Sequence, residues 1–480
     1  MDKDELELSN KKGLYYRLFA SLGLVGMICA LSVGNLIAFL LIILVPLSII
    51  ILISIFNNPA VLFYIIFIAN YFIIGIVRYV DISGISVFMD ALLISELLII
   101  FIHIAFAKII HLRSALNILS GVTFLWMIYC IIEVINPSGM FEAWVLSRGL
   151  IFNGFIITIF ASLIIVRFKQ VKIIIILYSI LTIIAIAKAM MQKYLGFDFA
   201  EQRWLNEGGA STHIISTGTR YFSFFTDAGN FGSNMGCAAI LFTIMAFYVQ
   251  NKGLKIYFLI VAAISAYAMM MSGTRGAIIV PLGGLALYTI VSKNFKALIV
   301  GGVLLTGIYV FFAFTYIGQS DPMIRRMRTA FNPSEDASFN VRVENKKKLA
   351  DHLKNKPFGE GLGLSGVENK KTSDRFTTQV PHDSWYVKLW VETGIVGLLL
   401  YIAGLVAVVI NCAYIIMFKI KSREVKGVLT AMLCGIFGLM LSAYGNAFFG
   451  QYPTMIIVFV FLSIILKGQL LDKTVSKQLI

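Results

Sequence analysis

The chain has 480 residues, of which 59% are hydrophobic, and its mean hydropathy is +0.87. This composition is too apolar for an ordinary water-soluble enzyme, so it indicates an integral membrane protein. Lys and Arg outnumber Asp and Glu by 40 to 25, which gives a formal net charge of +15. In a membrane protein such an excess points first to basic loops on one side of the bilayer.

Repeated apolar runs of about 20 residues predict an all-α polytopic membrane protein. The first run, residues 18–56, is long enough for two short helices that turn near Ser32–Asn35. Further spans are expected at residues 59–79, 88–107, 116–135, 148–166, 173–192, 229–249, 254–274, 277–292, 297–317, 394–417, 427–447 and 453–467. These runs predict about 14 transmembrane helices, or about 12 or 13 if the first pair is miscounted.

The loop charges predict an orientation. Basic residues gather in alternate short loops: Lys108 and Arg113; Arg167, Lys169 and Lys172; Lys252 and Lys255; Lys293 and Lys296; Lys419, Lys421, Arg423 and Lys426. By the positive-inside rule these loops are cytoplasmic, as are the tails 1–17 and 468–480. Spans 1–11 then lie within residues 18–317 and the last three within 385–467. The long segments 193–228 and 318–384 are external.

The external segment 318–384 is expected to be partly helical. The pattern predicts a helix over residues 339–356 that ends before Pro357, and the sequence FGEGLGLSG that follows predicts a flexible, glycine-rich turn. The helix carries many basic residues. It either lies as a solvated basic surface on anionic lipid or helps to guide an anionic substrate.

Three side chains at the predicted outer face could carry chemistry. Arg275 lies in SGTRGA at the end of one span, Arg220 in GTRYFSFFTDAGNFG before another, and His382 in PHDSWYVKLWVETGIVG. Each has a plain alternative, because a boundary arginine can simply snorkel and a wet loop histidine is common. The sequence shows no metal motif and no nucleotide-binding loop. We therefore expect no cofactor and no metal, and we interpret the five cysteines as packing residues.

These three stretches together resemble the O-antigen ligase and O-antigen polymerase superfamily of bacterial envelopes. SGTRGA is similar to the family's small-residue–arginine–glycine motif, RYFSFFTDAGNFG to its arginine–aromatic block, and PHDSWYVKLWVETGIVG to its histidine motif closed by Glu-x-Gly-x-x-Gly. VRVENKKKLADHLKNKPFGEGLG is similar to the loop segment in which an arginine precedes a helix and a Pro-x-Gly-x-Gly turn. One departure is Gly229, where many members have proline.

The resemblance implies a metal-independent, inverting glycosyltransferase with a fold similar to the GT-C class and a periplasmic active site. The donor would be a glycan on undecaprenyl diphosphate. Arg220 and Arg275 would bind the diphosphate, and His382 would act as general base on the acceptor hydroxyl. The location would be the bacterial inner membrane, with no nucleic-acid partner.

Three further residues are candidates for supporting roles: Arg342, Asn230 and Glu392. Glu392 follows His382 by ten residues. On a continuous helix that spacing places the two side chains about 80° apart, so we expect Glu392 to support packing or to orient a neighbour rather than to contact His382.

Two readings within this family remain open, and one outside it. A repeat-unit polymerase would use a second lipid-linked glycan as acceptor, with a chain-length regulator as a candidate partner, whereas a ligase would use lipid A-core. A transporter of lipid-linked sugars would use the same arginines for binding alone. A transporter needs charged residues deep within its spans, for which Glu96 and Lys188 are the main candidates.

Overall fold

The computed structural model describes residues 25–26, 29, 32, 36–80, 84–107, 112–215, 218–293, 295–331 and 337–478. The chain divides into two compact units, Met1–Leu62 and Phe63–Ile480. In the first unit the described chain forms the apolar helix α2 (Leu36–Asn57), which contains Pro46. The predicted helix before it, and residues 33–35 of the predicted turn, lie outside the described residues.

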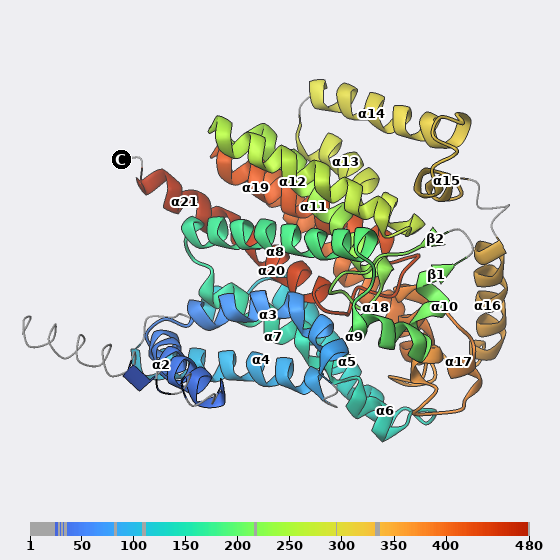
Figure 1. Cartoon of the computed structure of the whole chain (residues 1–480), viewed down its shortest axis with the longest axis horizontal. Helices are drawn as coiled ribbons and strands as arrows, with labels where there is room; N and C mark the ends of the chain where they lie inside the picture. Colours follow the sequence, from blue (N-terminus) through green and yellow to red (C-terminus); the bar gives the residue numbers. More distant parts are fainter. Residues whose placement is uncertain are drawn as a thin grey trace, which may run out of the picture. The chain divides into compact units, whose positions relative to one another are not determined.

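The second unit is built from helices, and its one described sheet has only two strands (Figure 1). Its first half contains α3 (Ala60–Tyr79), α4 (Ile85–Ile102), η1 (His103–Ala107), η2 (Leu112–Ala115), α5 (Ile118–Ile132), η3 (Glu133–Ile135), α6 (Phe141–Leu146), η4 (Gly149–Asn153), α7 (Gly154–Ile164) and α8 (Phe168–Tyr194). The core continues with α11 (Ala228–Tyr248), α12 (Lys252–Met271), η6 (Arg275–Ile278), α13 (Ile279–Val291), α14 (Phe295–Phe314), α18 (Trp385–Phe418), α19 (Arg423–Ser442), α20 (Thr454–Leu466) and α21 (Gly468–Gln478).

The prediction of an all-α polytopic membrane protein is confirmed. Each span expected from residue 59 onward coincides with a helix of the second unit. Within the described residues, eight helices are long and apolar enough to cross a membrane, or up to nine if α20 and α21, bent by 61°, form one span. Four shorter apolar helices, Ile42–Asn57, Gly149–Ile164, Arg275–Val291 and Gly301–Phe314, accompany them. The predicted number of 14 spans is not established by these lengths.

Helices α11 and α19 form the centre of the second unit, since 83% of each apolar span is buried. They run alongside α12 and α13 (Figure 1). Glycine lets these backbones approach closely: a Cβ atom on Gly438 of α19 would lie 2.2 Å from the Val280 carbonyl oxygen of α13. Small residues are the usual means of close helix packing in membranes.

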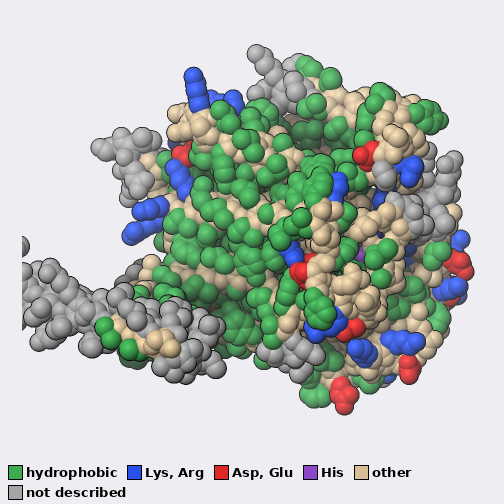
Figure 2. Space-filling model, in the orientation of Figure 1, with side chains coloured by type: hydrophobic (Ala, Val, Ile, Leu, Met, Phe, Trp, Pro, Cys, Tyr) green, Lys and Arg blue, Asp and Glu red, His purple; other side chains and the backbone are tan. Residues whose placement is uncertain are grey.

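Apolar side chains also cover much of the surface of the second unit. Figure 2 shows green side chains over the middle and charged side chains toward both ends. Side chains of both signs lie at the end with α16 and α17, which we call the charged end, and mostly Lys and Arg lie at the opposite end. Leu399, Val406 and Ile410 of α18 are among the exposed apolar residues. An apolar surface of this kind is suited to contact with lipid rather than with water.

The two long segments between spans form the charged end. Residues 193–228 contain α9 (Phe199–Trp204), η5 (Leu205–Gly209), α10 (Ala210–His213) and the antiparallel strands β1 (Ile214–Ile215) and β2 (Gly218–Thr219). Residues 318–384 contain α15 (Pro322–Arg328), α16 (Ala337–Leu353), η8 (Val367–Asn369) and α17 (Phe376–Gln379). Helix α16 begins two residues before the predicted helix and ends three before its predicted end.

Candidate active site

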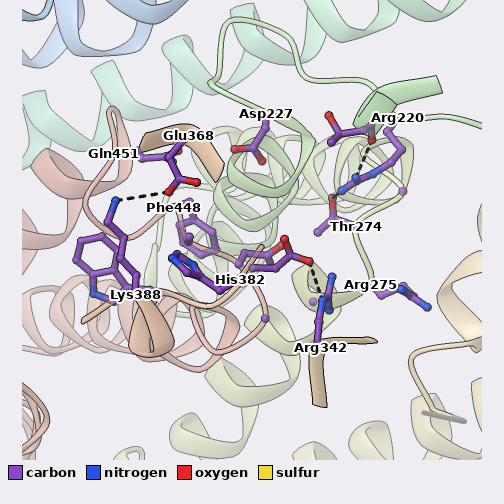
Figure 3. A pocket seen from close by; sticks show the side chains of 18 of the residues that line it. Arg220, Asp227, Thr274, Arg275, Arg342, Glu368, His382, Lys388, Phe448 and Gln451 are labelled. Atoms are coloured by element: carbon purple, nitrogen blue, oxygen red, sulfur yellow. Dashed lines mark hydrogen bonds and ion pairs between the residues drawn. The ribbon is translucent and has the colours of Figure 1, made fainter. Parts of the chain in front are cut away.

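A large cavity of about 1630 Å³ opens among the helix ends and loops of the charged end. Its walls come from η6, α15, α16, the start of α18 and the segment between α19 and α20. Arg220, Arg275 and His382, which lie far apart in the sequence, all line it (Figure 3). The structure therefore brings the three principal candidates into one space.

Arg220 is held at the cavity wall by neutral oxygen atoms. Its Nη1 donates to the Thr212 carbonyl oxygen and its Nη2 to Thr274 Oγ1, both at 2.9 Å. Thr274 Oγ1 in turn donates to the Ala228 carbonyl oxygen at 2.9 Å. Burial lowers the pKa of Arg220 from its ordinary value, although a guanidinium remains charged at neutral pH. Thr274 thus joins the Arg220 motif to the neighbouring Arg275 motif.

Arg275 begins the short helix η6, and its Nη1 donates to Thr329 Oγ1 at 3.3 Å. Helix α15, which contacts η6, contributes Arg325, Arg326 and Arg328 to the cavity lining. Arg326 Nε donates to the Gly273 carbonyl oxygen, two residues before Arg275. These three arginines were visible in the sequence only as loop charge, because nothing in the spacing of α15 shows that it packs beside η6.

Arg342 also lines the cavity, and its Nε lies 2.7 Å from Asp383 Oδ2. Both side chains are partly exposed, at 39% and 54%. The pair links α16 to the residue directly after His382. The family pattern suggested an arginine before the helix, but Arg342 lies within α16.

His382 lies between Pro381 and the N-cap of α18, Ser384, whose side chain accepts from the Val387 N–H. Neither ring nitrogen forms a hydrogen bond with another of the described residues, although both are buried from solvent. Burial lowers the pKa of His382 from its ordinary value, and the charge of Lys388 lowers it further, against the opposing effect of Glu368. The ring is therefore neutral at pH 7 and able to accept a proton.

Glu392 is fully buried in α18 and lines the same cavity as His382. Its Oε1 accepts from Ser365 Oγ at 2.7 Å and lies 3.8 Å from Lys388 Nζ. The predicted rotation of about 80° between Glu392 and His382 assumed one continuous helix through both residues. That assumption is wrong, because α18 begins at Trp385 and His382 is not part of the helix.

The glycine-rich segment after α16, which was predicted to be a flexible turn, packs inside the protein, since residues 359–366 are all buried. Helix α18 is broken at Gly394, whose φ of 66° is outside the helical range. The break frees helix carbonyl groups, and the segment supplies donors: Glu360 N–H to Val391 O at 2.8 Å and Gly361 N–H to Glu392 O at 3.0 Å. The segment therefore fixes the half of α18 that carries Lys388 and Glu392.

Asn230 does not line the cavity. Its Nδ2 donates to the Tyr452 carbonyl oxygen at 3.0 Å, and its Oδ1 accepts from Thr454 Oγ1 at 2.7 Å, so it ties α11 to α20. Gly229, which replaces the proline of many family members, donates its N–H to Asp227 Oδ1 at 2.6 Å. Proline has no N–H and could not make that cap.

The cavity also contains residues that the sequence did not single out. Arg148 Nε lies 2.6 Å from Asp90 Oδ2, and Lys388 Nζ lies 3.7 Å from Glu368 Oε1. Tyr452 accepts from Asn153 Nδ2 through its hydroxyl at 3.1 Å. These pairs join residues far apart in the chain, so no local pattern reveals them. Among the described residues, no group of three metal-ligating side chains could hold an ion.

Residues 260–402 match the family profile described as O-antigen ligase. The match shows an O-antigen ligase domain in this part of the chain and supports the resemblance to the O-antigen ligase and polymerase superfamily. The matched segment includes Arg275, Arg342, His382 and Glu392, whereas Arg220 precedes it. A search of curated proteins finds no match. The O-antigen ligase match supports membrane glycan processing of the ligase or polymerase type.

Proposed function

We propose that the protein is an integral-membrane glycosyltransferase that moves a glycan from undecaprenyl diphosphate to a hydroxyl group of an acceptor sugar. The observation that carries this proposal is the meeting of Arg220, Arg275 and His382, from three separate motifs, in one cavity. The family match makes a lipid-linked glycan the natural donor. The reaction uses only side chains of the protein and needs no metal ion.

The arginines act on the donor. A guanidinium binds phosphate oxygens through two parallel charge-assisted hydrogen bonds, and several guanidiniums lie together here. When the bond between the anomeric carbon and the diphosphate oxygen breaks, its electron pair stays on the diphosphate. Positive charge already in place stabilises this developing negative charge without further reorganisation.

His382 acts on the acceptor. As the acceptor oxygen attacks the anomeric carbon, one ring nitrogen takes the hydroxyl proton. The lowered pKa of His382 keeps the ring neutral at pH 7. A single displacement from the face opposite the diphosphate inverts the anomeric configuration. Asp383 is already paired with Arg342, which leaves His382 as the better base.

We place the cavity on the periplasmic side of the bacterial inner membrane, with both termini in the cytoplasm, because the short basic loops mark the other side. Lys371 and Lys421 are both exposed and lie at opposite ends of this topology. In a Cys29→Ser background, Lys371→Cys should react with an impermeant thiol reagent in intact spheroplasts, whereas Lys421→Cys should react only after lysis. The reverse pattern contradicts the orientation.

Within this proposal we favour a repeat-unit polymerase over a ligase that uses lipid A-core. The purified protein is incubated with its lipid-linked repeat unit alone and then with lipid A-core added. A ladder of products in the first reaction identifies a polymerase, for which a chain-length regulator is a candidate partner in the cell. A single shifted lipid A product in the second identifies a ligase. No glycan transfer in either reaction contradicts the proposal.

A transporter is the alternative from a different class. Its two candidate residues within the spans, Glu96 and Lys188, do not line the cavity. Lys188 is paired with Asp198 at 2.7 Å and with Glu201 at 3.0 Å. These two ion pairs give its charge a structural role. These placements favour the enzyme. Movement of a lipid-linked glycan across vesicles without any new glycosidic bond would favour the transporter.

A further inference from the structure

The cavity has two ends of different chemistry. Its volume of about 1630 Å³ exceeds the roughly 300–1,000 Å³ of pockets that hold one small ligand. In Figure 3, Arg220, Arg275 and Arg342 lie on one side of His382, and Glu368, Lys388, Gln451 and Phe448 lie on the other. We name the second side the mixed-charge end, and it contains Glu368, Lys388 and Gln451. Tyr452 follows Gln451 directly, and Asp90 and Arg148 lie close enough to Tyr452 to interact with it electrostatically, so we include these three cavity-lining residues.

Charges at the mixed-charge end are balanced by close partners. Asp90 lies 2.6 Å from Arg148, and Lys388 lies within 4 Å of both Glu368 and Glu392. A second diphosphate would find carboxylates beside each of these cations and would be repelled by them. The balance suits a ligand that is polar but uncharged.

The same end combines planar hydrogen-bonding groups with aromatic rings. The Asp90 carboxylate and Arg148 guanidinium accept and donate in fixed planes, and the Gln451 amide accepts from Thr226 Oγ1 at 2.5 Å. Trp385 and Phe448 are also among the lining residues, with 4% and 1% of their surface exposed. A sugar offers neighbouring hydroxyl groups that match such planar groups, and an apolar C–H face that matches aromatic rings.

We propose that the mixed-charge end binds the terminal sugar of the acceptor glycan and directs its attacking hydroxyl toward His382. This inference rests on the proposed glycosyltransferase function and adds the location and chemical class of the acceptor site. Sugar hydroxyls are common to a lipid-linked repeat unit and to lipid A-core, so the same subsite serves either acceptor. The donor diphosphate occupies the arginine side, and His382 lies between the two substrates.

The test measures binding of two probes that each fit one end. The first is the oligosaccharide released by mild acid from the lipid-linked repeat unit of cells that lack this protein. The second is undecaprenyl diphosphate without a glycan. Asp90→Asn and Glu368→Gln should each weaken binding of the oligosaccharide at least tenfold. Saturation-transfer NMR measures this binding. Both variants should leave the Kd for undecaprenyl diphosphate within about twofold, since the ion-pair partners of these two carboxylates are Arg148 and Lys388 and not the arginines of the arginine side.

Asp198→Asn is the matched control, because it also removes a carboxylate from a 2.7 Å ion pair but lies outside the cavity. It should leave both affinities unchanged. Glu368 is half exposed on η8, so Glu368→Gln tests the subsite even if Asp90→Asn folds poorly. Unchanged oligosaccharide binding in Glu368→Gln overturns the inference, as does an equal loss for both probes.

These readouts separate the inference from the proposed function, because binding needs no turnover. If the wild-type protein transfers no glycan but binds the oligosaccharide through Asp90 and Glu368, the proposed activity is wrong and the sugar subsite still stands. A protein that transfers glycan normally, with oligosaccharide binding insensitive to both variants, loses the subsite alone. Repeating the NMR titration with lipid A-core oligosaccharide shows which acceptor the subsite prefers.

Discussion

The two ends of the cavity differ in how their charges are compensated. On the arginine side, Arg220 and Arg328 donate to carbonyl and hydroxyl oxygens, so neutral groups hold them and their positive charge remains available. At the mixed-charge end, Arg148 and Lys388 each lie beside a carboxylate. Arg342 is an exception on the arginine side, because it is paired with Asp383. A site for a charged leaving group needs cations that are not cancelled, whereas a site for a neutral sugar needs fixed hydrogen-bonding directions without net charge.

The strongest test of this division removes the residue between the two ends. His382→Ala should bind both undecaprenyl diphosphate and free oligosaccharide normally and transfer glycan at least about a hundredfold more slowly, the usual range for loss of a general base. Initial rates with lipid-linked repeat unit measure the effect. His352→Gln is the control, because His352 lies on α16 outside the cavity. Wild-type polysaccharide synthesis by His382→Ala would remove the base from the mechanism.

The second test acts on the arginine side alone. Arg275→Ala and Arg220→Ala should each weaken binding of undecaprenyl diphosphate and slow transfer about tenfold to a hundredfold, the value of a charge-assisted hydrogen bond. Arg275→Lys keeps the charge but loses the planar fork, so it should still lose much of the activity. Arg423→Ala, which removes an exposed arginine from the start of α19, should have no effect. Normal donor binding in both alanine variants contradicts the assignment.

Much of this arrangement could be predicted from the sequence, and the reasons are physical. Apolar runs have the length that a bilayer imposes, so the helices from α3 to α20 fall where hydropathy placed them. Arg220, Arg275 and His382 lie at span ends on one side, which predicted that they share an aqueous face. Their actual meeting involves contacts between distant parts of the chain, such as the hydrogen bond between Arg220 and Thr274, which links residues 54 positions apart.

The rest depended on contacts that have no local signal. Asp90 and Arg148 are 58 positions apart, and each alone resembles an ordinary boundary charge. The glycines of residues 358–366 predicted a flexible turn. Composition alone cannot show that the break in α18 supplies hydrogen-bond acceptors that hold this segment in place. The sequence predicted that Glu392 and His382 point in different directions, on the assumption that one helix runs through both residues. Ser384 caps α18 between them, so that assumption does not hold.

A smaller effect is expected at the exposed ion pair on the arginine side. Arg342 and Asp383 are both partly exposed, and exposed ion pairs contribute about 0.2–1 kcal/mol. Asp383→Asn should therefore change the transfer rate less than about fivefold, and high salt should reduce the difference further. Rates at low and high salt check this. A loss as large as that of Arg275→Ala would mean that the pair is part of the diphosphate site.

The smallest effect is a shift of the pH profile without a large change in the maximal rate. Transfer requires neutral His382, so the rate rises with pH through its pKa, which burial places below the ordinary histidine value of about 6.5. Lys388→Met removes a charge that lowers this pKa and should move the acid limb to higher pH. Glu368→Gln removes a negative charge that raises the pKa of His382, so it should move the acid limb to lower pH. Shifts in the same direction would show that these charges do not act on the base.

The broken helix α18 also limits how the protein can be divided or recombined. Glu360 and Gly361 donate their N–H groups to α18, and the Val396 N–H of α18 donates back to the Pro357 carbonyl oxygen at 3.3 Å. A Cβ atom on Gly394 would lie only 1.9 Å from that same oxygen. A soluble fragment cut at residues 318 and 384 would leave these partners behind and should not hold its native shape. Exchange of this segment between related enzymes therefore needs to carry α18 along, at least through Gly397.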